Sequence, residues 1–201
     1  MIELLNFTYK TNKVLFEGAD FKAPSIGIIG IVGESGCGKT TFLKIISKQI
    51  HVDSMVNDAT SIFYGNQDAL LKRDLTIIQQ FELIESIYNR EHDQNTIDEL
   101  FNSLNIKASL SQKYDSCSLG EKKRIMIALS VYSNSPCIIL DEPLSSVDYE
   151  DKHSIMKLLK EYSHDRVIIL TIHDEEFDEY LDIKYLIENP VSYTHLRAHE
   201  T

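Results

Sequence analysis

Several features that would place this chain in other protein classes are missing. No apolar run approaches the about 20 residues that cross a bilayer, and we expect no signal peptide because an apparent strand starts at once. The three cysteines (Cys37, Cys117 and Cys137) lack metal-ligand spacing, so we expect reduced thiols and a cytosolic setting. Internal repeats and low-complexity segments are absent as well. A soluble globular domain is the class that these absences leave.

Basic residues are scarce compared with acidic ones. The 201 residues include 31 Asp and Glu against 20 Lys and Arg, a net charge of −11. Residues 141–182 alone contain 13 acids and 4 bases. A surface of this sign repels nucleic acid and anionic lipid head groups. We therefore expect no nucleic-acid partner, and we interpret most of these acids as solvated helix faces.

Residues 33–40 match the phosphate-binding pattern G-x-x-x-x-G-K-[ST] at every fixed position. Glycines let successive backbone N–H groups converge on a phosphate, Lys39 adds a positive charge, and Thr40 offers a hydroxyl to Mg²⁺. The motif lies between an expected strand at 25–32 and an expected helix at 40–50, the order that this chemistry requires. We interpret Cys37 as a small filling residue rather than a reactive thiol. The nucleotide-binding residues predicted in this segment are Gly33, Glu34, Ser35, Gly36, Cys37, Gly38, Lys39, Thr40 and Thr41.

A second motif is the apolar run at 137–140, which ends in two carboxylates. A buried strand would deliver Asp141 to its end, where the carboxylate can join a Mg²⁺ shell. Glu142 would then face an attacking water as general base. Strands often end in acids, so the pattern alone is weak. About a hundred residues after a phosphate loop, it indicates a nucleotide-hydrolysing site.

With these motifs the sequence resembles the ATP-binding subunit of ABC transporters over residues 1–189. Residues 117–121 (CSLGE) stand where that family carries L-S-G-G-Q, and a basic run follows at 122–124. Ser118 and Gly120 match the family, whereas Leu119 replaces a glycine. This loss of glycine restricts the backbone and adds bulk, so we expect weaker closure on ATP.

The resemblance implies roles for residues outside the phosphate loop. Ser118, Gly120 and Glu121 would cap the nucleotide held by a partner's loop, and Asp148, in the loop at 145–148, would touch that partner. His173 lies 32 residues after Asp141 and resembles the histidine that orients Glu142 and water. The implied catalytic residues are Glu142, His173 and Lys39; the implied metal ligands are Thr40, Gln67 and Asp141; further implied nucleotide contacts are Tyr9, Gln67, Ser118, Gly120, Glu121 and Asp148.

Two of these assignments have rivals in the sequence. Gln67 resembles the glutamine that joins the core to a helical insert, but Gln79 and Gln80 are nearby. Tyr9 resembles the aromatic residue that stacks on adenine, and Phe7 competes for that role. We prefer Gln67 because 75–77 fits the helix entry that follows it in the family, and we prefer Tyr9 for stacking.

Alternating strands and helices predict a mainly parallel α/β sheet. The resemblance implies a P-loop NTPase core, a small antiparallel β subdomain and a helical insert at about 68–117, all in one domain at 1–189. Lys39 and Gln67 are 28 residues apart, short for the family, so we expect an abbreviated accessory sheet. Residues 190–201 read as translated sequencing adapter rather than native protein, and we exclude them. We expect strands at 3–9, 14–21, 25–32, 61–64, 136–140, 166–172 and 184–187, and helices at 40–50, 76–89, 96–104, 118–132, 151–162 and 174–181.

The function that the resemblance implies is that of an ATPase using ATP and Mg²⁺. It would pair with an identical or related subunit, sit in the cytoplasm on the inner face of the membrane, and drive a separate transmembrane permease. One alternative is a soluble cassette ATPase acting in translation or on DNA, but these usually carry two cassettes or a long coiled coil. The other is a small-molecule kinase with a phosphate loop, which leaves Ser118, Asp148 and His173 unexplained.

Overall fold

Two β-sheets organise the protein in its computed structural model, which describes residues 2–12, 14–53, 55–57, 59–66, 74–188 and 197–200. The larger sheet has the order β5-β6-β7-β3-β8-β9, parallel except for β9 at one edge. The smaller sheet is antiparallel, in the order β2-β1-β4. The strands are β1 Ile2–Lys10, β2 Val14–Ala23, β3 Gly27–Val32, β4 Met55–Asn57, β5 Phe63–Gly65, β6 Cys137–Leu140, β7 Val167–Thr171, β8 Ile183–Leu186 and β9 Arg197–Glu200.

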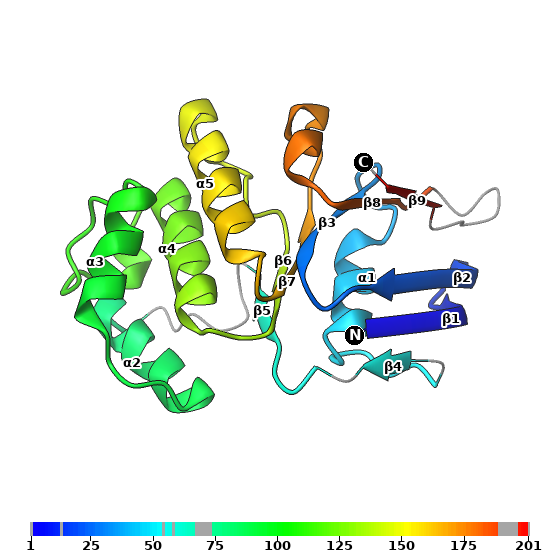
Figure 1. The fold of residues 1–201 in the computed structure, drawn as a ribbon, viewed down its shortest axis with the longest axis horizontal. Coiled ribbons are helices and arrows are strands. Elements are labelled where there is room, and N and C mark those ends of the chain that lie inside the picture. The colour runs from blue at the N-terminus through cyan, green and yellow to red at the C-terminus, as the bar shows by residue number, and fades with distance from the viewer. Residues whose placement is uncertain are drawn as a thin grey trace.

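Helices cover both faces of the larger sheet. Helix α1 lies between the two sheets, whereas α4 and α5 cover the opposite face and α2 and α3 pack beside α4 (Figure 1). No helix in the described part of the chain combines the length and the apolar character needed to cross a membrane. The helices are α1 Lys39–Ile46, α2 Ile77–Tyr88, α3 Gln94–Ser103, α4 Leu119–Tyr132 and α5 Tyr149–Tyr162, with 3₁₀ helices η1 Tyr114–Ser116 and η2 Glu175–Tyr180.

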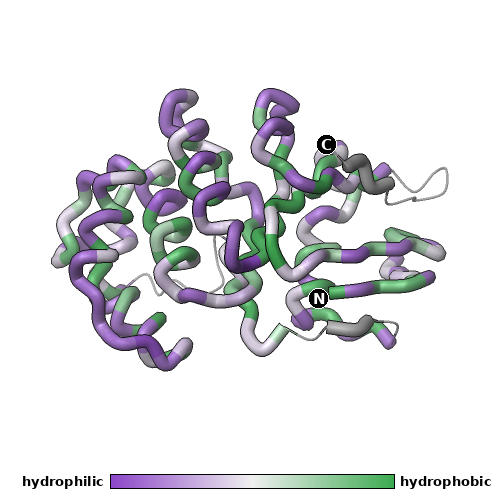
Figure 2. Tube along the Cα trace, in the orientation of Figure 1, coloured by the Kyte–Doolittle hydropathy of each residue, from purple (hydrophilic) through white to green (hydrophobic). Residues whose placement is uncertain are grey.

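The central strands are apolar throughout because both of their faces are buried. In β6, Ile138 and Leu140 join the core beneath α4 and α5, while Cys137 and Ile139 join the core around α1. Successive side chains of a strand point to opposite faces, so a continuous apolar run is the pattern of a parallel strand covered on both sides. Figure 2 shows the hydrophobic residues gathered along these strands.

An aromatic cluster fastens α1 to the smaller sheet. The ring of Phe42, on α1, has its centroid 5.0 Å from that of Phe21 and 5.7 Å from that of Phe16. The hydroxyl of Tyr185, on β8, donates to the carbonyl of Lys22 at 2.9 Å and so ties the two sheets together. Burial of three phenylalanine rings contributes several kcal/mol. This packing fixes the position of α1 relative to both sheets.

The expected architecture is confirmed in type, with local differences. The predicted accessory sheet is indeed short: β4, which the sequence did not predict, has only three residues and pairs with β1. The helix expected at 174–181 is 3₁₀ rather than α. Within 190–201, residues 197–200 form β9; the adapter interpretation of the whole segment stays a prediction.

Candidate active site

Three segments that are far apart in the sequence meet at one edge of the larger sheet. Strands β6, β7 and β3 are parallel neighbours, and Ile31 pairs with Thr171 near their carboxyl ends. The phosphate loop follows β3, His173 follows β7, and Asp141 follows β6. Because parallel strands end at the same edge, their following residues converge there. The sheet thus brings together the predicted phosphate, metal and catalytic residues on these three strands.

The glycines of the phosphate loop serve different purposes. A Cβ on Gly33 would lie 2.4 Å from the carbonyl oxygen of Ile187 and 2.8 Å from the Sγ of Cys37, so no side chain fits. Gly36 has φ 78° and nothing within 4 Å of a Cβ position, which leaves its surroundings open. Gly38, at φ 111°, is the N-cap residue of α1. Gly33 has φ 153°, and all three φ values lie where L side chains are disfavoured.

The Lys39 side chain is held by backbone carbonyls of the phosphate loop itself. Its side chain is buried, and its Nζ donates to the carbonyls of Gly33 at 2.8 Å and Glu34 at 2.9 Å. An ammonium has three N–H donors, so one remains for a ligand oxygen. Thr40, the next residue, is exposed at the start of α1. The loop thus combines one anchored cation with one accessible hydroxyl.

Thr171 holds the two carboxylate residues together. Its Oγ1 accepts from the backbone N–H of Glu142 at 2.6 Å and donates to Oδ1 of Asp141 at 3.1 Å. Glu142 has φ 50°, the left-handed region, which is strained for a glutamate. Buried Lys123 donates to the Glu142 carbonyl at 2.8 Å. Burial lowers the pKa of Lys123, and the charges of Glu142 and Asp141 oppose that shift.

His173 and Glu142 face each other at the site. The His173 Nε2 lies 3.6 Å from the Oε1 of Glu142, and both side chains are about half exposed, at 47% and 48%. Neither is held in the core, so both can reach a ligand. The pair that the sequence predicted to act together is therefore adjacent.

The start of α4 carries the segment predicted to reach a partner's nucleotide. Ser118 accepts from the Glu121 N–H at 3.2 Å, and the Glu121 carboxylate accepts from the Ser118 N–H at 3.0 Å, forming a capping box. A Cβ on Gly120 would lie 3.0 Å from the carbonyl oxygen of Ser146, so the loop before α5 approaches closely here. Leu119 is 50% exposed, so its bulk faces outward rather than into the core.

The other residues predicted to contact the nucleotide are Tyr9, Gln67 and Asp148, and the structure describes Tyr9 and Asp148 but not Gln67. Phe7 is 1% exposed within the aromatic cluster, so it is not free to stack on a base, whereas Tyr9 is half-buried on the same strand. Gln67 lies outside the described residues. Its rivals are engaged elsewhere: Gln79 caps α2 through Thr76, and Gln80 is 1% exposed. Asp148 precedes α5 and is exposed, with no capping bond from its side chain.

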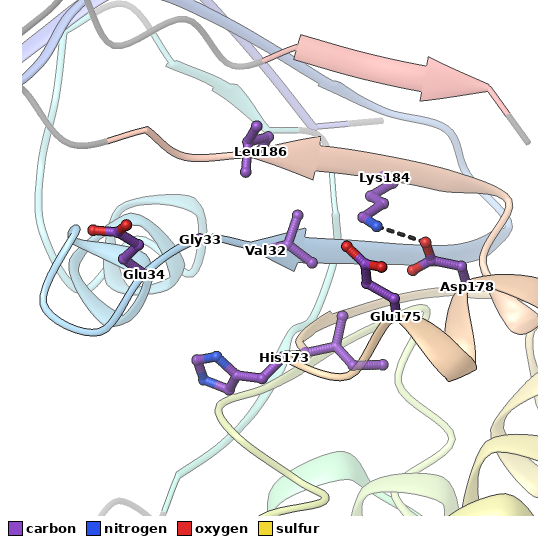
Figure 3. A pocket seen from close by; sticks show the side chains of 9 residues that line it. Val32, Gly33, Glu34, His173, Glu175, Asp178, Lys184 and Leu186 are labelled. Carbon is purple, nitrogen blue, oxygen red and sulfur yellow. Dashed lines mark hydrogen bonds and ion pairs between the residues drawn. The ribbon is translucent and has the colours of Figure 1, made fainter.

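A cavity of about 630 Å³ adjoins the phosphate loop (Figure 3). It lies between the ends of β3 and β7, strand β8 and η2, and an ion pair of Lys184 with Asp178 at 2.5 Å borders it. Its volume falls in the range of small-molecule sites. The lining residues are Val32, Gly33, Glu34, Ile172, His173, Glu175, Asp178, Lys184 and Leu186.

Sequence reasoning missed two residues that support the site. Thr171 ends an apolar strand, and its only sequence signal is a hydroxyl two residues before His173. Lys123 sits in the basic run at 122–124, where a cation gives no sign of being buried. Both act through partners 18 to 30 positions away, which a local pattern does not reveal.

Comparison with known proteins shows a family whose model matches this sequence and several relatives that align over most of its length. The family model described as ABC transporter matches residues 16–145. A cytochrome c biogenesis ATP-binding export protein of Reclinomonas americana is 30% identical, over 83% of this chain and 81% of its own length. A phosphonates import ATP-binding protein of a Synechococcus strain is 26% identical, over 86% of this chain and 75% of its own.

Solved structures share the fold. A dimeric ATP-binding cassette bound to ADP and phosphate has a TM-score of 0.79 at 20% identity, covering 100% of this chain and 98% of its own. An ATP-binding subunit of an ABC transporter has a TM-score of 0.81 at 17% identity, covering 100% and 90%. Both confirm the arrangement of a parallel sheet with a small antiparallel sheet.

Proposed function

This chain belongs to the ABC transporter family as its ATP-binding cassette, an ABC ATPase, and we propose that it works as a pair. Two cassettes close over two ATP molecules. Each site combines the phosphate loop of one cassette with Ser118, Gly120 and Glu121 of the other. Hydrolysis removes the γ-phosphate contacts and lets the pair reopen, which is a two-state switch biased by ligand.

The observation that carries this proposal is the convergence of Lys39, Asp141, Glu142 and His173 at one sheet edge, while Ser118 caps a helix elsewhere. The first four supply charge, a carboxylate pair and a histidine on one side of a nucleotide. Gly120, in the first turn of α4, comes close to Ser146 in the loop before α5. A second subunit would therefore bring its own α4 to complete the site.

The proposed chemistry is positioning together with electrostatic stabilisation. The loop N–H groups and the remaining N–H of Lys39 hold the phosphates. Glu142 takes a proton from the attacking water, and His173, 3.6 Å from the Glu142 carboxylate, donates to the γ-phosphate. Tyr9 stacks on the base. Gly36, open on its Cβ side, lets a phosphate approach the backbone.

The residues present fit Mg²⁺ as a cofactor. Thr40 offers an exposed hydroxyl and Asp141 a carboxylate, and oxygen donors of this kind suit a hard cation. Gln67 is the third proposed ligand. When bound, the ion would neutralise charge on the β- and γ-phosphates.

The proposed partner is a separate transmembrane permease, which places the cassette in the cytoplasm on the inner face of the membrane. Similar proteins are named for both export and import, so we assign cargo and direction to that membrane partner. The paired cassette is a second copy of this chain or a related one. Nucleic acid is not a partner, in keeping with the net charge of −11.

The test is substitution of the proposed base. We expect Glu142→Gln to bind ATP normally, to lose turnover by at least about a hundredfold, and to accumulate as a pair in light scattering with ATP. Glu161→Gln, an exposed carboxylate at the far end of α5, is the matched control. Normal hydrolysis by Glu142→Gln would remove the base assignment. Wild-type protein that hydrolyses ATP at full rate as a single subunit at every dilution would overturn the pair.

A further inference from the structure

The turn that carries His173 has one charged anchor that the proposed chemistry does not use. The Nζ of Lys152, in the first turn of α5, lies 3.0 Å from Oδ2 of Asp174. Asp174 directly follows His173 in the chain. The Lys152 side chain is 21% exposed and that of Asp174 is 48% exposed. The pair is therefore partly shielded from water on the lysine side.

The same lysine borders a small cavity that Glu142 and His173 also line. This cavity, of about 70 Å³, is lined by Glu142, Lys152, Thr171, His173 and Asp174 with three neighbouring residues. Lys152 thus lines the same small cavity as the proposed base, Glu142, and the proposed phosphate ligand, His173. A cation in this place can influence how both side chains are held.

Two further contacts fasten η2, the helix after this turn, to the first turn of α5. The hydroxyl of Tyr149 donates to Oε2 of Glu176 at 2.9 Å, and Nδ1 of His153 lies 3.3 Å from the hydroxyl of Tyr180. Upstream, the last strand-like bond runs from the Ile172 N–H to the Ile31 carbonyl at 3.1 Å. His173 therefore sits on a short turn between a fixed strand end and a tethered helix.

We propose that Lys152 is a positioning residue for ATP hydrolysis, holding Asp174 so that His173 faces Glu142. This inference rests on the proposed function of His173 and Glu142. Lys152 acts through Asp174 and does not touch the nucleotide. Because Lys152 lies four residues after Asp148, the same turn of α5 also links the loop that reaches the partner to the histidine at the chain's own site.

Water screens the ion pair between Lys152 and Asp174, and this limits how much its loss can change the rate of hydrolysis. A partly exposed ion pair changes a conformational equilibrium only modestly, so its loss changes the equilibrium constant between the observed turn and other conformations by about fivefold, which is the upper limit of the change in population. We expect Lys152→Met to lower kcat for ATP hydrolysis by up to about fivefold, with KM for ATP changed less than about twofold. The unfolding midpoint should stay close to that of the wild type.

Three further variants separate positioning from a general structural role. Lys152→Arg keeps the positive charge and should retain most of kcat. The double variant of Lys152→Asp with Asp174→Lys restores an ion pair and should recover part of the activity lost by either change alone. Lys157→Met, at an exposed lysine on the same helix, should behave as wild type.

The outcomes are distinguishable. If wild-type protein shows no ATP hydrolysis or no ATP-dependent pairing, the proposed function itself fails. If wild-type protein is active and Lys152→Met has the same kcat, or if Lys152→Arg is as impaired as Lys152→Met, the positioning role fails while the proposed function stands. A fall in kcat of up to about fivefold with little change in KM, rescued by arginine, supports the inference.

Discussion

Replacing Thr171 by valine tests how the carboxylate pair is held. Valine has nearly the same shape, so Thr171→Val removes the hydroxyl and leaves the packing of β7 in place. Two hydrogen bonds disappear: the one from the Glu142 N–H at 2.6 Å and the one to the Asp141 carboxylate at 3.1 Å. The Glu142 backbone, at φ 50°, then loses a contact that holds its strained conformation.

The magnitude follows from the two bonds. A neutral hydrogen bond contributes about 1 kcal/mol. The bond to the carboxylate is intrinsically stronger, but Asp141 is partly exposed and water replaces part of it, so we take about 1 kcal/mol for it too. A loss of about 2 kcal/mol in the free energy of unfolding lowers Tm by about 4–8 °C for a chain of this size. Displacement of Asp141 and Glu142 should lower kcat by about tenfold or more.

Thr171→Ser is the matched control, because it keeps the hydroxyl and loses a buried methyl group. Its stability should fall by about 1 kcal/mol, whereas its kcat should stay near wild type. Thermal unfolding by circular dichroism and steady-state phosphate release measure the two properties separately. The reasoning is refuted if valine retains wild-type kcat and Tm, or if serine and valine lower kcat equally.

Two other predictions concern the phosphate loop and alkaline stability. Gly33→Ala should lower both Tm and ATP affinity, because its Cβ would lie 2.4 Å from the Ile187 carbonyl oxygen. Gly36→Ala, with nothing within 4 Å of its Cβ in the chain itself, should cost the fold only backbone strain of about 1–2 kcal/mol, while its methyl group obstructs the phosphate. Equal Tm of the two variants by circular dichroism would contradict this. Burial raises the pKa of Tyr64 and of Tyr88 from 10 to about 12. Between these pH values the folded protein keeps phenol protons that the unfolded chain releases. The contribution of the two tyrosines to the free energy of unfolding is therefore fully present below pH 10 and should be lost as the pH rises through about 12. Tyrosinate absorbance followed together with circular dichroism checks this, and ionisation of both phenols near pH 10 in folded protein would contradict it.

The phosphate loop could be predicted because its chemistry is contiguous. Eight neighbouring residues supply the glycines, Lys39 and Thr40, so a local pattern contains the phosphate-binding segment. The central strands were equally readable, since burial on both faces leaves a continuous apolar run. Strand β4 was not, because its three residues are a strand only through pairing with β1.

By itself, the sequence determined most of the central strands and α-helices, the phosphate-binding loop and the order of the carboxylates and the histidine, because these depend on neighbouring residues. The tertiary structure alone decided that Phe7 is core, that Thr171 joins Asp141 to Glu142, and that Lys152 reaches Asp174. Those contacts depend on which strands become neighbours in a sheet and which helix turns face each other. The separation of two residues along the chain does not reveal such neighbours. The contacts that hold the site residues in place can therefore be identified only once the strands of the larger sheet lie side by side.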